Sequence, residues 1–179
     1  KECNEPLKTV KTILLGGEKL SEQLWQKVAN ATDAKIFNGY GPTEISACCS
    51  IKLVNSTDVT IGKPLPNVKI YICNSKTNLL PVGIPGEICV AGVGVANGYL
   101  NNEVETNKRF IKNPFGNDFI YKTGDLGKFR ENGEIEYINR LDNQVKMRGL
   151  RIELGEIESL ILKYPNIKNA IVLKQTANN

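Results

Sequence analysis

Residues 9–17 read TVKTILLGG and residues 35–37 read KIF, and the segment between them decides the expected fold. TVKTILLGG is a short apolar run closed by two glycines, which is typical of a buried strand that ends in a turn. Ser21 can cap a helix over SEQLWQKVANA, in which apolar residues recur on one face. A strand, a helix and a second strand in this order form a β-α-β unit, whose connection favours a parallel sheet.

The second expected strand runs into NGYGPTE at residues 38–44, where a turn precedes a hydroxyl and a carboxylate. Gly39 and Gly41 permit a sharp turn and a close approach of the backbone to a ligand, and Pro42 stiffens the loop. Open α/β sheets bind ligands at the carboxyl ends of their strands, which is where we expect this loop. The alternative is a plain surface turn with no ligand.

Three side chains of this loop suit a nucleotide. Tyr40 offers a flat face for a base, the Thr43 hydroxyl can donate to a phosphate oxygen, and Glu44 is a hard oxygen ligand for magnesium. A second polar stretch, YKTGDLG at residues 121–127, is expected to form a turn after an aromatic residue. Its Asp125 can accept hydrogen bonds from the two adjacent hydroxyls of a ribose, although an aspartate in a turn also serves as an Asx cap.

The pattern changes near residue 60. Three short alternating runs, VKIYIC, GEICVAG and GEIEYIN, are typical of antiparallel strands in a small barrel or sandwich. No long helix is expected until ELGEIESLILKYP, which Pro165 stops, and NAIVLK (169–174) then reads as another strand. We therefore expect residues 1–60 to belong to an α/β sheet, residues 60–141 to a distorted antiparallel barrel, and residues 142–179 to begin a new α/β unit.

Two further stretches are rich in glycine or charge. GVGVANG (92–98) is similar to a phosphate-binding glycine loop, but its GxGxxxG spacing and the absence of a convincing helix after it argue against dinucleotide binding. INRLDNQVKMRGLRIELGEIE (138–158) gathers charges of both signs around Gly149, with Arg140 and Asp142 at its start. On composition alone, this second stretch is also consistent with a charged linker between domains.

Composition argues against several classes of function. The net charge is +4, with Lys and Arg scattered among Asp and Glu, so no basic stripe indicates nucleic acid or a membrane surface as a partner. The five cysteines include no CxxC pair and the chain has no histidine, which argues against a zinc site and excludes a Ser-His or Cys-His nucleophile within it. No apolar run approaches the roughly 20 residues of a membrane helix. We expect a cytoplasmic protein with reduced thiols.

Taken in order, NGYGPTE, GEICVAGVGVANGYL, YKTGDLG and INRLDNQVKMRGLRIELGEIE resemble the core motifs of the adenylation domains of nonribosomal peptide synthetases, within the superfamily of adenylate-forming enzymes. The resemblance covers most of the chain from residue 38 to residue 158. It implies a mixed α/β fragment of such a domain. Residues 1–141 would be the C-terminal part of the large core domain, and residues 142–179 would start the mobile, small α+β C-terminal domain.

The resemblance also implies a reaction, in which an amino acid and MgATP give an aminoacyl adenylate and pyrophosphate. The acyl group would then pass to the phosphopantetheine thiol of a carrier domain. Such chemistry needs positioning and charge neutralisation more than a general base, so the missing histidine is no objection. The family's roles would place Asn38 and Tyr40 at the adenine, Thr43 at the α-phosphate, Glu44 at magnesium and Asp125 at the ribose, with Tyr137 and Arg140 along the nucleotide, Asp142 at the hinge and Gly149 in the loop that enters the site for thioester formation.

Aligning the chain with the family puts small or apolar residues on the wall of the amino-acid pocket. A charged substrate side chain would be unpaired there, so an apolar amino acid is favoured. The wall positions are Leu14, Gly16, Gly39, Ala47 and Cys48. Two positions depart from the family: Asn97 stands where arginine is usual, which would remove a salt bridge, and Asn139 stands where glycine is usual and can adopt left-handed dihedrals.

We expect the 179-residue chain alone to be inactive. It begins with Lys1 and not with methionine, which suggests a piece of a longer protein; the family's phosphate-gripping loop would precede residue 1 and its catalytic lysine would follow residue 179. Uncovered apolar surface would favour self-association of the chain. Two alternatives stay open: a carrier-protein D-alanine ligase, and a non-catalytic remnant or interaction module that keeps the motifs.

Overall fold

The expected β-α-β unit is present, and it opens a mixed α/β fold with three sheets in the part of the chain that the structure describes. The computed structural model describes residues 7, 9–142, 144–147, 150–173 and 175. In chain order the elements are β1 (Thr12–Gly16), α1 (Glu22–Ala31), β2 (Lys35–Tyr40), η1 (Thr43–Ile45), β3 (Ser50–Leu53), β4 (Lys63–Pro64), β5 (Val68–Cys73), β6 (Gly86–Gly92), α2 (Glu103–Arg109), β7 (Phe110–Lys112), β8 (Phe119–Phe129), β9 (Ile135–Arg140), β10 (Gln144–Met147), β11 (Leu150–Glu153) and α3 (Leu154–Ile161).

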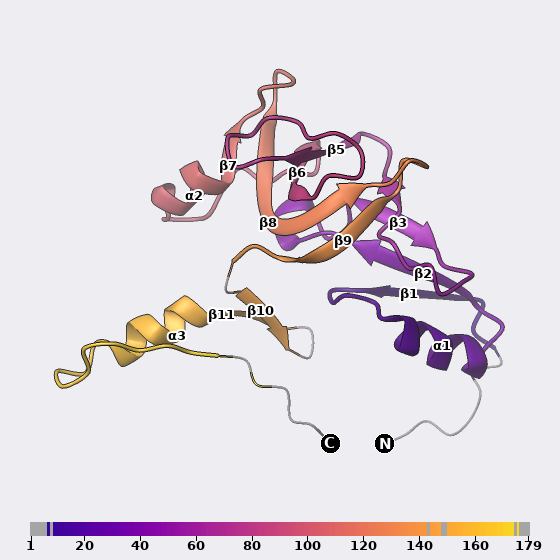
Figure 1. The fold of residues 1–179 in the computed structure, drawn as a ribbon, viewed down its shortest axis with the longest axis horizontal. Helices are drawn as coiled ribbons and strands as arrows, with labels where there is room; N and C mark the ends of the chain where they lie inside the picture. The colour runs from indigo at the N-terminus through magenta and orange to yellow at the C-terminus, as the bar shows by residue number, and fades with distance from the viewer. Residues whose placement is uncertain (1–6, 8, 143, 148–149, 174, 176–179) are drawn as a thin grey trace.

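The first sheet has the order β1-β2-β3-β4. Its strands β1 and β2 pair directly in parallel, and α1 connects them along the chain (Figure 1). Ser21 caps α1 as expected, because its side chain accepts a hydrogen bond of 3.1 Å from the backbone N–H of Leu24. The helix is also tied to the far end of β3, where Nε1 of Trp25 donates to the carbonyl oxygen of Val54 at 3.1 Å. The N-terminal part of the sequence-based prediction is therefore confirmed.

β2 is longer than the sequence indicated, and it contains half of the expected turn. The strand continues through Gly39 to Tyr40, so the chain turns only at Gly41 and Pro42. Gly39 does not break the strand because it pairs with Gly16 of β1. The two backbones lie so close that a Cβ on Gly16 would be only 2.8 Å from the carbonyl oxygen of Gly39. Close approach of the two backbones, and not a turn, is the use of glycine here.

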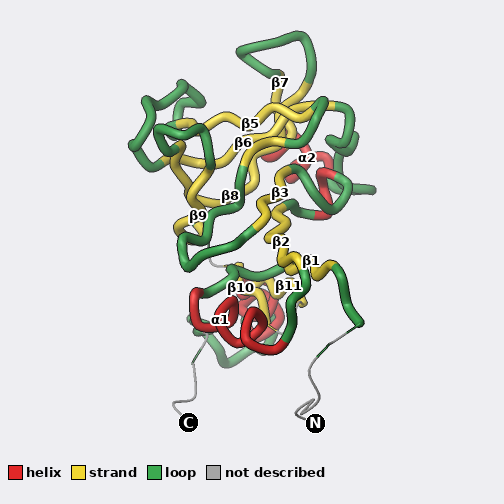
Figure 2. The backbone as a smooth tube through the Cα atoms, turned by 90° about the vertical axis from the view of Figure 1, so that its right-hand side faces the viewer, coloured by secondary structure: helices red, strands yellow, loops and turns green. Residues whose placement is uncertain are grey.

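The runs expected to be strands after residue 60 form one antiparallel sheet, with the order β5-β6-β8-β7 and with β9 paired to β8. Figure 2 shows this sheet above β1 and β2 in that view. Among the described residues the sheet stays open and no closed barrel forms. Its core is a cluster of buried side chains, namely Ile45, Cys49, Ile61, Ile70, Ile72, Ile88, Val90, Phe110, Tyr121 and Ile135.

YKTGDLG lies inside β8 and is not the turn that the sequence indicated. Gly124 has a φ of +72°, and β8 is drawn as a long, strongly bent strand (Figure 1). At the bend the backbone N–H of Asp125 donates to Oγ1 of Thr123 at 3.0 Å, while the same hydroxyl donates to the carbonyl oxygen of Ile88 at 2.8 Å. The register between β6 and β8 shifts here, and pairing of Lys122 and Leu126 with β6 and of Asp125 with β9 keeps Thr-Gly-Asp within the strand.

Two smaller elements also differ from expectation. The short helix α2 was not anticipated; the side chain of Asn102 caps it by accepting a 3.1 Å hydrogen bond from the backbone N–H of Glu105. After α3, which matches the expected helix, residues 169–173 form no strand. Ile171 and Leu173 are 81% and 80% exposed, which shows that the apolar run of residues 169–173 is not packed. An apolar run needs a partner strand to form a stable strand.

The hairpin of β10 and β11 follows β9 after a break in pairing near residue 142. A domain boundary at that residue stays a prediction. No described helix is both long enough and apolar enough to cross a membrane.

Candidate functional site

A cleft with about 570 Å³ of empty space, partly open to solvent, lies where the two main sheets meet. The β1–α1 turn, the end of β2, the loop before β4, the bend of β8 and the side chain of Tyr137 on β9 contribute its walls. The lining residues are Gly17, Glu18, Lys19, Leu20, Asn38, Gly39, Tyr40, Gly41, Val59, Thr60, Ile61, Asp125 and Tyr137.

Asp125 is the buried carboxylate of this cleft and is only 4% exposed. The hydroxyl of Tyr40 donates to Oδ2 of Asp125 at 2.6 Å, and Nη1 of Arg140 donates to Oδ1 at 3.0 Å. Burial, and then the neighbouring Asp125 charge, raise the pKa of Tyr40 well above its usual value, so the phenol keeps its proton and donates it. Each carboxylate oxygen still has a lone pair for a further donor, such as a hydroxyl of a sugar diol.

Aromatic faces and a fixed amide lie beside the carboxylate. The rings of Tyr40 and Tyr137 have centroids 6.1 Å apart and are tilted by 47°, and Nζ of Lys19 lies 5.9 Å from the centroid of Tyr137. Asn38 is 5% exposed, and its Nδ2 donates to the carbonyl oxygen of Thr60 at 2.8 Å. This hydrogen bond fixes the orientation of the Asn38 amide, and with it the position of the acceptor Oδ1. The cleft combines two tilted aromatic rings with oriented polar groups, a combination that suits a nucleoside.

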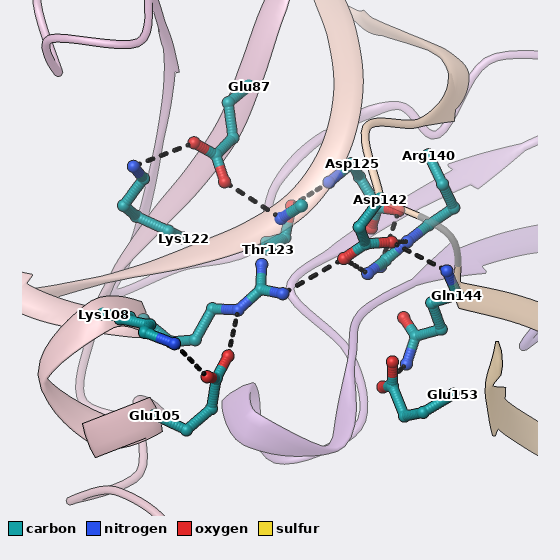
Figure 3. A network of polar contacts seen from close by, with 12 residues as sticks. Glu87, Glu105, Lys108, Lys122, Thr123, Asp125, Arg140, Asp142, Gln144 and Glu153 are labelled. Atoms are coloured by element: carbon teal, nitrogen blue, oxygen red, sulfur yellow. Dashed lines mark hydrogen bonds and ion pairs between the residues drawn. The ribbon is translucent and has the colours of Figure 1, made fainter. Parts of the chain in front are cut away.

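An ion-pair network continues from Asp125 to α2 (Figure 3). Arg140 donates to both oxygens of Asp142, from Nε at 2.8 Å and from Nη2 at 2.6 Å. Arg109 donates from Nη2 to Oδ2 of Asp142 at 3.1 Å and from Nε to Oε1 of Glu105 at 3.0 Å. Burial works against the charge of Asp142, but hydrogen bonds from the two arginines outweigh it and lower the pKa of that carboxyl. Asp142, the residue assigned to the hinge by resemblance, is thus held by two elements.

Thr43 and Glu44 lie on η1, and neither lines the cleft. Thr43 is exposed, whereas Glu44 is only 7% exposed and its Oε1 accepts a 2.7 Å hydrogen bond from the hydroxyl of Tyr99. The structure therefore brings Asn38, Tyr40, Asp125, Tyr137 and Arg140 together, and places Thr43 and Glu44 just beyond the turn that follows Tyr40.

The donor set around Glu44 bears on a magnesium ion. No group of three or more His, Cys, Asp or Glu side chains that would hold a metal is found among the described residues. Magnesium in nucleotide sites takes only one or two protein carboxylates and fills its other positions with phosphate oxygens and water. A single glutamate whose carboxylate is oriented by a tyrosine fits that requirement.

Four of the five expected pocket-wall positions gather around Gly39. A Cβ built on Gly39 would lie 3.1 Å from Cδ1 of Leu14 and 3.4 Å from Sγ of Cys48, and Gly16 faces Gly39 across the strand pair. Ala47 does not join them through its side chain; its backbone packs against Gly41 instead, with a φ of +75°. The expected loop residue Gly149 lies outside the described residues.

Comparison with known proteins identifies the family. A family model described as AMP-binding enzyme matches residues 1–100, which is more than half of the chain. The chain belongs to the AMP-binding enzyme family. Gramicidin S synthase 2 of Aneurinibacillus migulanus is 47% identical to this AMP-binding enzyme chain over 174 residues, which are 95% of the chain and 4% of the synthase. The chain thus spans a small part of the length of the relatives it matches.

Solved structures agree with this assignment. The AMP-binding enzyme chain is similar to PA1221, a nonribosomal peptide synthetase (NRPS) protein containing adenylation and PCP domains, with a TM-score of 0.80 and 27% identity over 93% of this chain and 36% of that one. It is also similar to AB3403, a four-domain nonribosomal peptide synthetase solved in its holo form bound to AMP and glycine, with a TM-score of 0.70 and 34% identity over 94% of this chain and 13% of that one.

The sequence reasoning missed three residues of the AMP-binding enzyme chain that contact the expected site residues: Tyr99, Tyr121 and Arg109. Each reaches its partner across a long separation in sequence, so no local pattern pointed to it. The available signal was that Tyr99 lies in GVGVANGYL and Tyr121 in YKTGDLG, both of which are recognised motifs. Asn139 also needs no special conformation: it lies in β9, where it pairs with Leu126 of β8, and it has no left-handed φ.

Proposed function

We propose that this chain is part of an adenylation domain that activates an amino acid with MgATP and transfers the product to the phosphopantetheine thiol of a carrier domain. The observation that carries the proposal is the buried Asp125, which faces a cleft with an aromatic wall and is oriented by Tyr40 and Arg140. A carboxylate with paired oxygens suits the vicinal hydroxyls of a ribose. The similarity to gramicidin S synthase 2 and to adenylation-PCP proteins supports the same reaction.

Four side chains at the cleft then have roles. Tyr40 and Tyr137 offer apolar faces to the adenine, and Asn38 offers a fixed polar edge. Arg140 places a positive charge next to the Asp125 carboxylate that would bind the ribose. The acyl-transfer step on an activated carboxyl group depends on such positioning and charge neutralisation.

Magnesium and the carrier belong to the same proposal. Glu44 would hold magnesium together with phosphate oxygens, and Thr43, which is exposed, would donate to the α-phosphate. When bound, magnesium neutralises charge on the phosphates. The neighbours that contain adenylation and PCP domains support a carrier domain as the acceptor of the acyl group.

The substrate is proposed to be an apolar amino acid. Leu14 and the thiol of Cys48 lie around Gly39, and a charged side chain would find no partner among these three residues. The proposal has four further parts: Asp142 acts as the hinge, a domain boundary lies at residue 142, the protein is cytoplasmic, and the chain by itself is inactive. Reduced cysteines support the location, since Cys48, Cys49, Cys73 and Cys89 are free thiols.

The test is amino-acid-dependent exchange of pyrophosphate into ATP by the complete protein whose reading frame contains this chain. Asp125→Asn keeps the shape of the side chain but removes its charge, so we expect the KM for ATP to rise by about tenfold to a hundredfold. Asp58→Asn is the matched control, because Asp58 also accepts from an arginine, Nη1 of Arg130 at 2.6 Å, but lies outside the cleft. Its kinetics should match those of the wild type.

The panel of amino acids separates the alternatives. Exchange with apolar amino acids supports the proposal, and exchange with D-alanine alone would favour a carrier-protein D-alanine ligase. A folded protein that shows no exchange with any amino acid would favour a non-catalytic module, and an unchanged KM in Asp125→Asn would refute the ribose contact.

A further inference from the structure

The loop after β6 braces the turn that carries Glu44. Three hydrogen bonds join the two segments, and none of them was expected from sequence. The backbone N–H of Ala96 donates to the carbonyl oxygen of Glu44 at 2.9 Å, Oγ of Ser46 donates to the carbonyl oxygen of Gly94 at 3.1 Å, and the Tyr99 hydroxyl donates to Oε1 of Glu44 at 2.7 Å. The last of these is the one that reaches the carboxylate itself.

Tyr99 is itself held firmly. Its backbone N–H donates to Oγ1 of Thr106 at 2.8 Å, and its ring packs edge-on against Phe110 with centroids 5.4 Å apart. Its hydroxyl oxygen lies 3.3 Å from that of Tyr121, which is 1% exposed and also packs on Phe110. Burial and the hydrogen bond with Tyr99 raise the pKa of Tyr121, so the Tyr121 phenol keeps its proton.

We propose that Tyr99 is a positioning residue that sets the orientation of the Glu44 carboxylate for the metal–nucleotide complex. The inference rests on the proposed function, because it takes Glu44 as the magnesium ligand. GVGVANGYL would then hold the metal ligand Glu44 in place and would not contact phosphate. This role explains why a glycine-rich stretch that lacks the dinucleotide-binding spacing lies next to the site.

The size of the effect follows from the contact. Without the Tyr99 donor at Oε1, the Glu44 carboxylate is less constrained, and the orientation that the tyrosine imposes must be supplied when the metal binds. Removing a hydrogen-bond partner of a metal ligand typically lowers metal affinity by about tenfold to a hundredfold. Tyr99→Phe removes the donor and keeps the ring that packs on Phe110.

The experiment measures Mn²⁺ binding by electron paramagnetic resonance, in the complete protein with a non-hydrolysable ATP analogue present. We expect the Kd for Mn²⁺ to rise by about tenfold or more in Tyr99→Phe. Tyr71→Phe is the matched control: its ring packs on Phe115, at 4.8 Å between centroids, in another cluster of the sheet, so its Kd should equal that of the wild type.

A second variant separates orientation of the carboxylate from stiffness of the turn. Ser46→Ala breaks the bond to Gly94 and leaves the contact between Tyr99 and Glu44 in place. We expect its Mn²⁺ affinity to stay within about twofold of the wild type, while urea midpoints show that each variant is folded. Equal losses in Ser46→Ala and Tyr99→Phe would overturn the positioning role.

The remaining outcomes are also decisive. An unchanged Kd in folded Tyr99→Phe, or a wild type that binds no Mn²⁺ with the analogue, overturns the inference. A wild type that binds Mn²⁺ but exchanges no pyrophosphate refutes the proposed function. Weaker Mn²⁺ binding by Tyr99→Phe in that case would still support the link between Tyr99 and a metal at Glu44.

Discussion

Gly124, at the bend of β8, is a position where one added methyl group should be disruptive, and two effects contribute. Its φ of +72° lies in the left-handed region, where alanine costs roughly 1–2 kcal/mol. A Cβ there would also lie 2.7 Å from Oδ2 of Asp142, 2.9 Å from Nη1 of Arg109 and 3.0 Å from Nη2 of Arg140. These side chains would have to move, which weakens at least one charge-assisted hydrogen bond.

The second effect can be given a magnitude. A hydrogen bond to a charged group contributes about 1.5–3 kcal/mol when it is well shielded. The side chains of Arg109 and Asp142 are 23% and 28% exposed, so solvent reduces the contribution, and we take about 1–2 kcal/mol. Gly124→Ala should therefore lower the free energy of unfolding by about 2–4 kcal/mol in all.

Gly133 provides the control. Its φ of +77° is nearly the same, but a Cβ there would meet only the flexible side chain of Lys63, at 3.7 Å. Gly133→Ala therefore carries the backbone cost alone, roughly 1–2 kcal/mol. With a urea dependence of about 2 kcal/mol per molar, the midpoint should fall by about 0.5–1 M for Gly133→Ala and by about 1–2 M for Gly124→Ala.

The assay is far-UV circular dichroism against urea concentration, on the wild type and both variants. Equal midpoint shifts in the two variants would refute the argument that the network crowds Gly124. A Gly133→Ala variant as stable as the wild type would refute the backbone cost on which both values depend.

Three further predictions concern stability and reactivity. Burial opposes the charge of Glu134, but the hydrogen bond from Lys52 at 2.7 Å outweighs it and lowers the pKa of Glu134, so its stabilisation should be present above about pH 4.3 and be lost as the pH falls further; in Lys52→Met, acid titration should show a smaller loss. Burial raises the pKa of Cys49 to about 12, so iodoacetamide should modify Cys48 well before Cys49 in the native protein, as mass spectrometry of timed samples would show; equal rates would contradict this. Ser21→Ala should remove the cap of α1 and lower the free energy of unfolding by about 1 kcal/mol, and an unchanged urea midpoint would exclude a capping contribution.

The elements that the sequence predicted correctly are those whose signal is local. The β-α-β unit was recognisable because a capped helix and two apolar strands each follow from neighbouring residues. The same local reasoning was wrong for residues 121–127, since strand pairing of the flanking residues keeps Thr-Gly-Asp inside β8 as an irregularity of the strand. It was wrong for residues 169–173 for the opposite reason, because no partner strand is present among the described residues.

The site shows the same division. Motif resemblance pointed to Tyr40 and Asp125 separately, but their hydrogen bond joins residues 85 positions apart, and spacing carries no information about such a contact. Arg109 was not anticipated at all, because its partner Asp142 is 33 positions away and belongs to a different motif. Side chains that hold other side chains in place are the part of a site that one sequence does not reveal.

The network from Glu105 to Asp125 also matters to anyone who recombines pieces of related domains. Its five members alternate in charge, and they come from α2, from β8 and from the segment at the end of β9. A crossover placed between residues 109 and 125 would pair an arginine from one parent with carboxylates from another. Junctions before residue 105 or after residue 142 would transfer all five together, and chimeras cut there should retain activity more often.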